Sequence, residues 1–292
     1  MMQLFFLRLG PIWAIVLANL WWGISPVYWH ELAALPALFV LSSRVVCSRI
    51  ALQFIPIEIP LEQRSPNWRL ALVTAALISL NWGLYIYAIL HGETVQASLG
   101  YFLLPLMAVG FAALWYKEVL SRYDLAAVVL AVVGVFFVAV KGEGVPVIAL
   151  GLALSMLFYT AIYRSSGIHP VVGLRAETTW LVPFALGYII WSWEEVGISM
   201  SSSELVFLML SGVVTVVPQY LFLSAVKEID FASVGFLQFI VPLAKLIVAV
   251  TVLGEALSRA DIVSFSLILV GVTLYCYGRY FRPTKLGIRV LS

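Results

Sequence analysis

Three ionisable side chains, Arg44, Glu177 and Lys245, lie inside long apolar stretches of this sequence. Charges within apolar helices are costly, and they commonly mark solute or proton pathways. An ion pair between Glu177 and either cation could simply fix helix packing. Alternatively, these charges could line a cavity and hold the carboxylate or amine of a zwitterionic solute, or Glu177 could take up a proton. We expect Glu177 to be the pivotal buried charge, partnered by Arg44 or Lys245.

Neutral polar and aromatic residues provide further candidates for solute binding. Asn81 and Tyr85 are four residues apart and share a helical face, from which Trp82 is displaced by about 100 degrees. Aromatic rings supply a flat apolar contact with an occasional hydrogen-bond donor. Ordinary packing or an interfacial aromatic belt is the alternative interpretation. We predict a site that contains Asn81, Trp82, Tyr85, Tyr101, Tyr163 and Gln238 together with Arg44, Glu177 and Lys245.

Other chemistry has little support in the sequence. The two cysteines, Cys47 and Cys276, lie in apolar runs, and neither His30 with Glu31 nor His91 with Glu93 has convincing metal-ligand spacing. A phosphate-cradling Gly-X-X-X-X-Gly-Lys motif is absent, so any energy would come from a solute or proton gradient. An intramembrane enzyme would need a nucleophile with its base, a His/Asp metal set or a paired acidic motif at membrane depth, and only one buried acid is expected. We therefore expect no cofactor, no metal and no catalysis.

Composition shows which elements must position these residues. Of 292 residues, 63% are hydrophobic and 11% charged, which excludes a water-soluble globule. The scattered basic residues do not suggest nucleic-acid binding. A membrane span needs roughly 20 mainly apolar residues. This length predicts ten transmembrane helices near 11–30, 36–56, 70–90, 95–116, 123–140, 146–163, 170–192, 204–225, 232–253 and 260–280.

The distribution of basic residues predicts the topology. With the N-terminus in the cytoplasm, twelve basic residues fall in inside segments, and only Lys141 and Arg259 fall outside. Such a bias in short loops is the positive-inside pattern. We therefore predict a multi-pass protein of the inner (plasma) membrane, with both termini cytoplasmic and with lipid around it; the oligomeric state is left open.

An internal repeat divides the chain. The segment 97–101 recurs as 232–236, and the run of Pro105, Glu118, Leu120, Ser121, Arg122 and Asp124 recurs at an offset of 137 as Pro242, Glu255, Leu257, Ser258, Arg259 and Asp261. The predicted halves are residues 1–142 and 143–292. Because five helices per half is odd, the second copy enters the membrane from the opposite side. Tyr101 with Pro105, repeated as Phe236 with Pro242, would lie on proline-kinked helices that line the cavity or form curved walls.

These repeated residues carry a family resemblance. Leu80-Asn81-Trp82-Gly83-Leu84-Tyr85, the segments 97–102 and 235–239, and the Glu-X-Leu-Ser pattern that ends each half resemble the RarD branch of the EamA-domain proteins, in the drug/metabolite transporter superfamily. The resemblance covers almost the whole chain. It implies ten helices around a central cavity, and relatives that export amino acids, including aromatic ones by YddG-like members, or that handle chloramphenicol.

The function predicted from sequence is a secondary transporter that exports small amphipathic metabolites by alternating access. Hydrophobic or aromatic amino acids are the expected solutes, and efflux of small drugs such as chloramphenicol is the alternative. A sensor or scaffold that transports nothing belongs to a different class, and it would have no reason to keep a polar central cavity.

Overall fold

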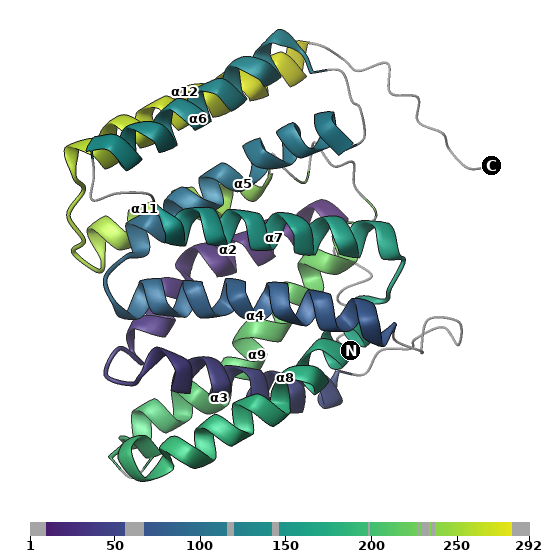
Figure 1. Ribbon diagram of the computed structural model, residues 1–292, viewed down its shortest axis with the longest axis vertical. Helices are drawn as coiled ribbons and strands as arrows, with labels where there is room; N and C mark the ends of the chain where they lie inside the picture. The colour runs from purple at the N-terminus through teal and green to yellow at the C-terminus, as the bar shows by residue number, and fades with distance from the viewer. Residues whose placement is uncertain are drawn as a thin grey trace. The chain divides into compact units, whose positions relative to one another are not determined.

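The computed structural model describes residues 10–55, 67–115, 120–141, 146–197, 199–226, 228, 234 and 237–281 (Figure 1). Over these residues the fold is all-helical, with ten α-helices at the ten predicted positions. Two short turns, η1 (Leu52–Phe54) and the π-helical η3 (Trp193–Gly197), extend helix ends. The helices are α2 (Pro11–His30), α3 (Ala37–Ala51), α4 (Trp68–Leu90), α5 (Thr94–Trp115), α6 (Arg122–Lys141), α7 (Val147–Ser166), α8 (Pro170–Ser192), α9 (Ser202–Ala225), α11 (Ile240–Thr251) and α12 (Arg259–Phe281).

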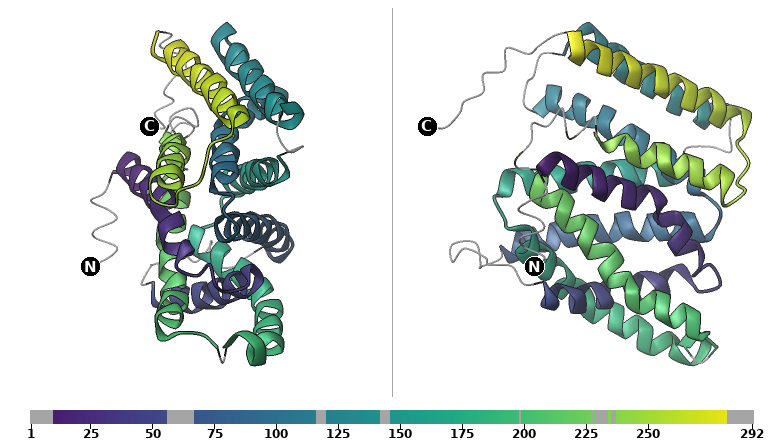
Figure 2. Two further views of the ribbon diagram at one scale, coloured as in Figure 1. Left: turned by 90° about the vertical axis from the view of Figure 1, so that its left-hand side faces the viewer. Right: turned by 180° about the vertical axis from the view of Figure 1, so that it is seen from behind.

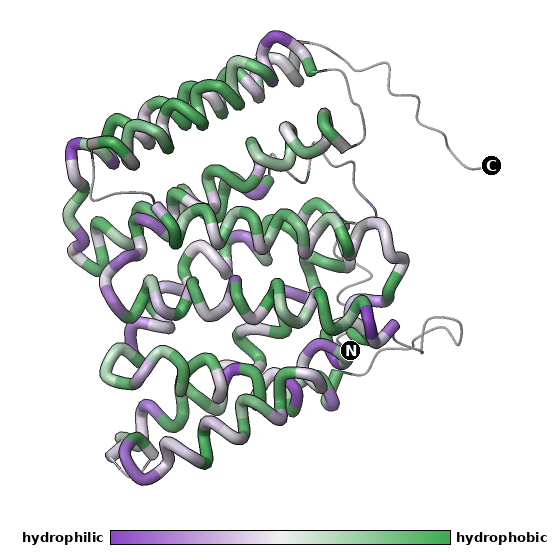
Figure 3. Tube along the Cα trace, viewed as in Figure 1, coloured by the Kyte–Doolittle hydropathy of each residue, from purple (hydrophilic) through white to green (hydrophobic). Residues whose placement is uncertain are grey.

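Several helices have the length and composition of membrane spans. Within the described residues six segments qualify, and the apolar segments Val147–Tyr163 and Ile240–Thr251 are shorter. Hydrophobic residues predominate along the helices in Figure 3. Large apolar side chains such as Phe184 (77% exposed) and Trp191 (76%) point outward, as expected where lipid covers the surface. The six segments are Pro11–His30, Ala37–Phe54, Trp68–Leu90, Thr94–Phe111, Ser202–Ala225 and Arg259–Gly278.

The larger of two compact units comprises residues 1–104 and 147–256 and interleaves helices from both predicted halves. In it, α3 packs on α8 and α9, α2 packs on α9 and α11, and α4 packs on α7 and α8 (Figure 2). Small residues allow the closest approaches: a Cβ at Gly212 of α9 would overlap the carbonyl group of Cys47 on α3. The two compact units therefore do not coincide with the two halves that the sequence repeat predicts.

The smaller unit, residues 105–146 and 257–292, contains α6 packed on α12. The repeated Ser-X-X-Asp residues begin these helices in the same way. The Asp124 carboxylate accepts from the Ser121 amide at 2.9 Å while Ser121 Oγ accepts from the Asp124 amide at 3.2 Å. The corresponding distances for Ser258 and Asp261 are 3.0 and 3.1 Å. The repeated motif thus forms two equivalent reciprocal N-caps.

The repeated acid Glu255 also has a capping role. Its two carboxylate oxygens accept from the backbone amides of Thr94 at 3.1 Å and Val95 at 2.9 Å, at the N-terminus of α5. Amides of a first helical turn have no partner within the helix, and the helix dipole favours a negative charge there. Glu255 therefore joins the end of α11 to the start of α5. The equivalent acid Glu118, and residues 232, 233, 235 and 236 of the repeat, lie outside the described residues.

Candidate functional site

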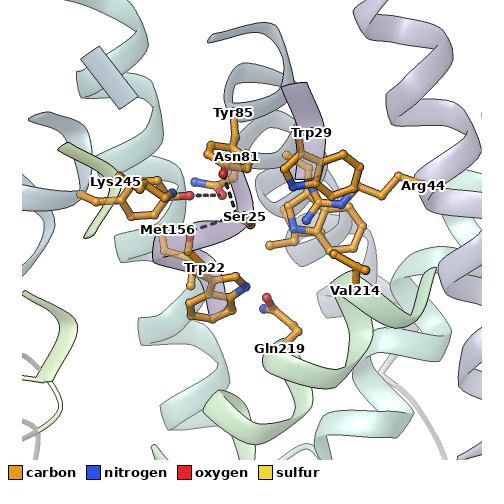
Figure 4. Close-up of a pocket in the computed structure, with 13 residues that line it drawn as sticks. Trp22, Ser25, Trp29, Arg44, Asn81, Tyr85, Met156, Val214, Gln219 and Lys245 are labelled. Atoms are coloured by element: carbon orange, nitrogen blue, oxygen red, sulfur yellow. Dashed lines mark hydrogen bonds between the residues drawn. The ribbon is translucent and has the colours of Figure 1, made fainter. Parts of the chain in front are cut away.

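A pocket lies within the larger unit and is lined from seven helices, α2, α3, α4, α5, α7, α9 and α11 (Figure 4). Its free volume is about 30 Å³, which accommodates water rather than an organic solute. Among the described residues, five aromatic rings, two cations and no acidic residue line it. The lining residues are Trp22, Ser25, Trp29, Arg44, Ile78, Asn81, Trp82, Tyr85, Tyr101, Met156, Val214, Gln219 and Lys245.

Arg44 occupies one side of the pocket. Its guanidinium carbon lies 4.3 Å from the ring centre of Trp82 and 4.8 Å from that of Trp29. Nε donates to Thr215 Oγ1 at 2.8 Å, whereas Nη1 is buried without a hydrogen-bond acceptor. The aromatic faces stabilise the cation. The Nη1 group remains available to donate hydrogen bonds to a ligand.

Lys245 faces the pocket from the opposite side in Figure 4. Its Nζ lies 3.5 Å from the ring centre of Tyr101 and 4.0 Å from that of Tyr85, and the residue is 1% exposed. The two rings are perpendicular to each other, with an interplanar angle of 85°. The ammonium group is thus stabilised by the faces of two rings. Ring faces are not conventional hydrogen-bond acceptors, so its N–H groups can still donate to a ligand.

A proline in α2 helps to orient Tyr85. Pro26 has no amide hydrogen, so the carbonyl of Trp22 cannot be bonded by the usual residue four positions later. The Ser25 hydroxyl donates to this carbonyl at 2.9 Å. Because the serine hydrogen is committed there, the Tyr85 hydroxyl donates to Ser25 Oγ, at 2.7 Å. This chain turns the face of the Tyr85 ring toward Lys245.

Asn81 is committed to helix packing rather than free to bind. Its Nδ2 donates to the carbonyl of Leu152 and to Ser155 Oγ, both at 3.0 Å, which ties α4 to α7. Its Oδ1 accepts from the Tyr101 hydroxyl at 3.4 Å. A solute could reach Asn81 only by displacing one of these partners. The predicted pair Asn81 and Tyr85 does line one pocket, but Asn81 positions its neighbours.

The sequence profile of the EamA-like transporter family matches residues 8–140 and again residues 145–277. The chain belongs to this family. YojE of Bacillus subtilis, named an uncharacterised transporter, is 33% identical over 88% of this chain and 90% of its own length. RarD of Escherichia coli is 32% identical, over 87% and 89%. A solved crystal structure shares the fold, with a TM-score of 0.63 at 18% identity, covering 92% of this chain and 99% of the other.

In this EamA-family protein, the predicted ion pair of Glu177 is wrong. Glu177 is 1% exposed and accepts from the hydroxyls of Tyr163 at 2.8 Å and Tyr159 at 3.2 Å. Neither Arg44 nor Lys245 is among its partners; Arg44 contacts Thr215 and two tryptophans, and Lys245 contacts two tyrosines. Arg44 points into the pocket, whereas Glu177 on α8 turns toward tyrosines of α7, so the two residues face different neighbours although α3 and α8 pack together. A carboxyl can be buried in this way because hydroxyl donors satisfy its oxygens.

The structure brings six predicted site residues together and separates three. Arg44, Asn81, Trp82, Tyr85, Tyr101 and Lys245 line the pocket. Glu177 and Tyr163 form their own cluster with Tyr159. Gln238 is 9% exposed and lies outside the lining.

Several lining residues were not predicted as site residues, and α2 supplies three of them. Trp22, Ser25 and Trp29 have the spacing of one helical face, which the sequence displays. Ser25 directly precedes Pro26, and this pair is a second feature of the sequence that could have indicated a site on α2. Met156, Ile78 and Val214 carry no such signal, because apolar residues within apolar helices look alike. Among the described residues no cluster suited to hold a metal ion is found.

Proposed function

We propose that this EamA-family transporter is a secondary transporter that exports small amphipathic metabolites bearing a carboxylate, by alternating access. Hydrophobic or aromatic amino acids are one such class. One observation carries the proposal: a pocket with two cations and five aromatic rings, lined by helices of both halves. The cations would hold a carboxylate, and the rings would cover an apolar body.

The packing of the helices supports two inverted five-helix repeats. Exchanging the halves, so that α2, α3, α4, α5 and α6 take the places of α7, α8, α9, α11 and α12, turns the α2–α9 contact into the α7–α4 contact. The same exchange turns α3–α9 into α8–α4, and it maps α3–α8 and α6–α12 onto themselves. A twofold relation between the halves has this property. Exchange of conformations between inverted repeats is the basis of alternating access.

The small free volume of the pocket fits this mechanism. A space of about 30 Å³ cannot contain an amino acid, so a solute must displace side chains or separate helices before it binds. The tryptophans and tyrosines of the lining are the groups that must move. We propose that solute binding and opening toward one face of the membrane are therefore the same event.

Efflux of small neutral drugs is the second candidate. One relative, from Pseudomonas aeruginosa, is named a chloramphenicol-sensitive RarD protein and is 29% identical over 85% of this chain. The aromatic walls would suit such a ligand. Two cations without a counter-charge are a poor match to a neutral solute, because burying them costs free energy that only an anion recovers.

Counterflow in proteoliposomes tests the proposal. Vesicles preloaded with unlabelled solute are mixed with trace labelled solute, over a panel of amino acids, related carboxylates and chloramphenicol. Saturable, competitive counterflow of a carboxylate is expected. Counterflow of chloramphenicol with no carboxylate active would favour the drug-efflux function, and no counterflow by any solute would favour a sensor or scaffold.

A further inference from the structure

The charge balance of the pocket is unusual for a site that binds zwitterions. Arg44 and Lys245 are 5% and 1% exposed, and the lining residues that the structure describes include neither aspartate nor glutamate. The buried acid Glu177 is engaged by Tyr159 and Tyr163 instead. Burying two cations without a carboxylate is unfavourable, and an anion that enters the site recovers part of that cost. The fold therefore holds a positive site whose counter-charge is supplied by none of the lining residues.

The hydrogen-bonding groups that face the pocket are biased toward donors. Arg44 Nη1 has no acceptor, and Lys245 Nζ has only ring faces beside it. Gln219 Nε2 is a third buried donor without a partner, whereas Ser25 Oγ already accepts from Tyr85 and Asn81 Oδ1 from Tyr101. A carboxylate accepts several hydrogen bonds and donates none. It is the group that completes this set.

An ammonium group, by contrast, is poorly accommodated here, because four of the five lining rings already face a cation. A protein binds an ammonium with carboxylates, carbonyl oxygens or aromatic faces. The faces of Tyr85 and Tyr101 are covered by Lys245, and Arg44 covers Trp82 and Trp29. An amino group brought into the pocket would meet two like charges. Juxtaposition of like charges is a common basis of selectivity against the wrong ligand.

We infer that the pocket selects organic anions: carboxylates that lack an ammonium group, held between Arg44 and Lys245, with the apolar body against the aromatic walls. This inference rests on the proposed function and narrows its substrate class. Within that class, a deaminated acid binds better than the amino acid with the same side chain. A solute with two carboxylates can engage both cations at once.

Matched ligand series on the unmodified protein test the inference. One series is 3-phenylpropionate, phenylalanine and 2-phenylethylamine; a second is 4-methylpentanoate, leucine and 3-methylbutylamine; glutarate and glutamate form the third. Binding in detergent is followed by calorimetry and by tryptophan fluorescence, since three tryptophans line the pocket. We expect the acid of each bound series to have a Kd at least about tenfold lower than its amino acid, and the amines not to bind. Equal or tighter binding of the amino acids, or no binding in any series, overturns the inference.

Charge variants locate the effect. R44Q and K245Q should each raise the Kd of the acid about tenfold and shrink its advantage over the amino acid. The matched control is R175Q, because Arg175 is a cation of α8 whose guanidinium donates to the Leu52 carbonyl at 2.8 Å, outside the pocket lining. If R175Q weakens binding as much as the pocket variants, the assignment is wrong. If a variant fails to fold, the ligand series on the unmodified protein still tests whether the pocket prefers organic anions.

Counterflow of the same ligands separates the two proposals. Tight binding of acids without counterflow overturns transport and leaves the anion site in place. Counterflow of amino acids or amines in preference to acids overturns the anion site and leaves transport in place. Counterflow of the acids that bind supports both.

Discussion

Replacing Tyr163 with phenylalanine tests how Glu177 is held. Tyr163 is 2% exposed, and its hydroxyl donates to the Glu177 carboxyl at 2.8 Å, while that of Tyr159 donates at 3.2 Å. Gly173 lies against the Tyr163 hydroxyl, and a Cβ there would overlap the hydroxyl oxygen. Phenylalanine keeps the ring in place and removes one donor. The expected result is a measurable loss of stability without a change of fold.

The size of this loss follows from the burial of the pair. Leaving a buried acceptor without its donor costs about 1–3 kcal/mol. Side-chain hydrogen bonds between transmembrane helices couple by about 0.6 kcal/mol on average and by up to about 1.7. Because the bond to Tyr163 is short and buried, we expect a coupling near the upper value, about 1–1.5 kcal/mol. Tyr159 forms the longer bond, so Y159F should cost less than Y163F.

A double-mutant cycle between Y163F and E177M measures this coupling by reversible SDS unfolding in mixed micelles. Methionine retains the approximate volume of glutamate without its oxygens. The Tyr159 hydroxyl loses its Glu177 acceptor in both variants that contain E177M, so this cost cancels in the cycle. The control cycle pairs E177M with R44Q, for which we expect coupling within about 0.5 kcal/mol of zero. A coupling near zero for Tyr163, or one above 1 kcal/mol for Arg44, would refute this description of the Glu177 site.

Three further predictions concern the scaffold. E255A should lower the unfolding free energy by about 1–2 kcal/mol, measured by the same SDS titration, because the first turn of α5 loses its cap; an unchanged titration would contradict that role. G212V should reduce the yield of folded protein, because its side chain would meet the α3 backbone, whereas G187A, with no atom within 4 Å of its Cβ, should not; equal yields would contradict the close packing. With both termini cytoplasmic, S202C should react with an impermeant maleimide on intact cells and S121C should not, and the reverse pattern would rule out this topology.

Helix positions could be predicted from the sequence because the signal is simple. Long apolar runs separated by polar residues fix where helices lie, and all ten predicted segments are helical in the described residues. The repeat signal also had a physical origin, since Ser121 and Ser258 form matching N-caps. The role of Glu255 at the start of α5 could not be predicted, because it joins residues 160 positions apart. No local pattern records such a contact.

The pocket could be predicted only in part. Charges and aromatic residues in apolar helices marked six lining residues, because their presence there is costly or unusual. Packing decides which face of a helix contacts which neighbouring helix. Because every face of these helices is largely apolar, the sequence does not show which face that is. For this reason the sequence marks Asn81 as a binding residue but does not show that its amide nitrogen joins α4 to α7. Trp29 was missed although Arg44 stacks on it.

The error about Glu177 has a consequence for function. Arg44 and Glu177 stand at nearly equivalent places in the two halves, on α3 and α8, which pack together, but each side chain follows its own helical face. Had Glu177 paired with Arg44, the two cations and one carboxylate would leave one net positive charge, and the pocket would offer a zwitterion both a cation and an anion. Because Tyr159 and Tyr163 retain Glu177 on the side of α7, Arg44 and Lys245 stay without a counter-charge among the residues that line the pocket. If the pocket selects anions as inferred, the tyrosine cluster contributes to that selectivity without touching a solute, because it holds Glu177 away from the two cations.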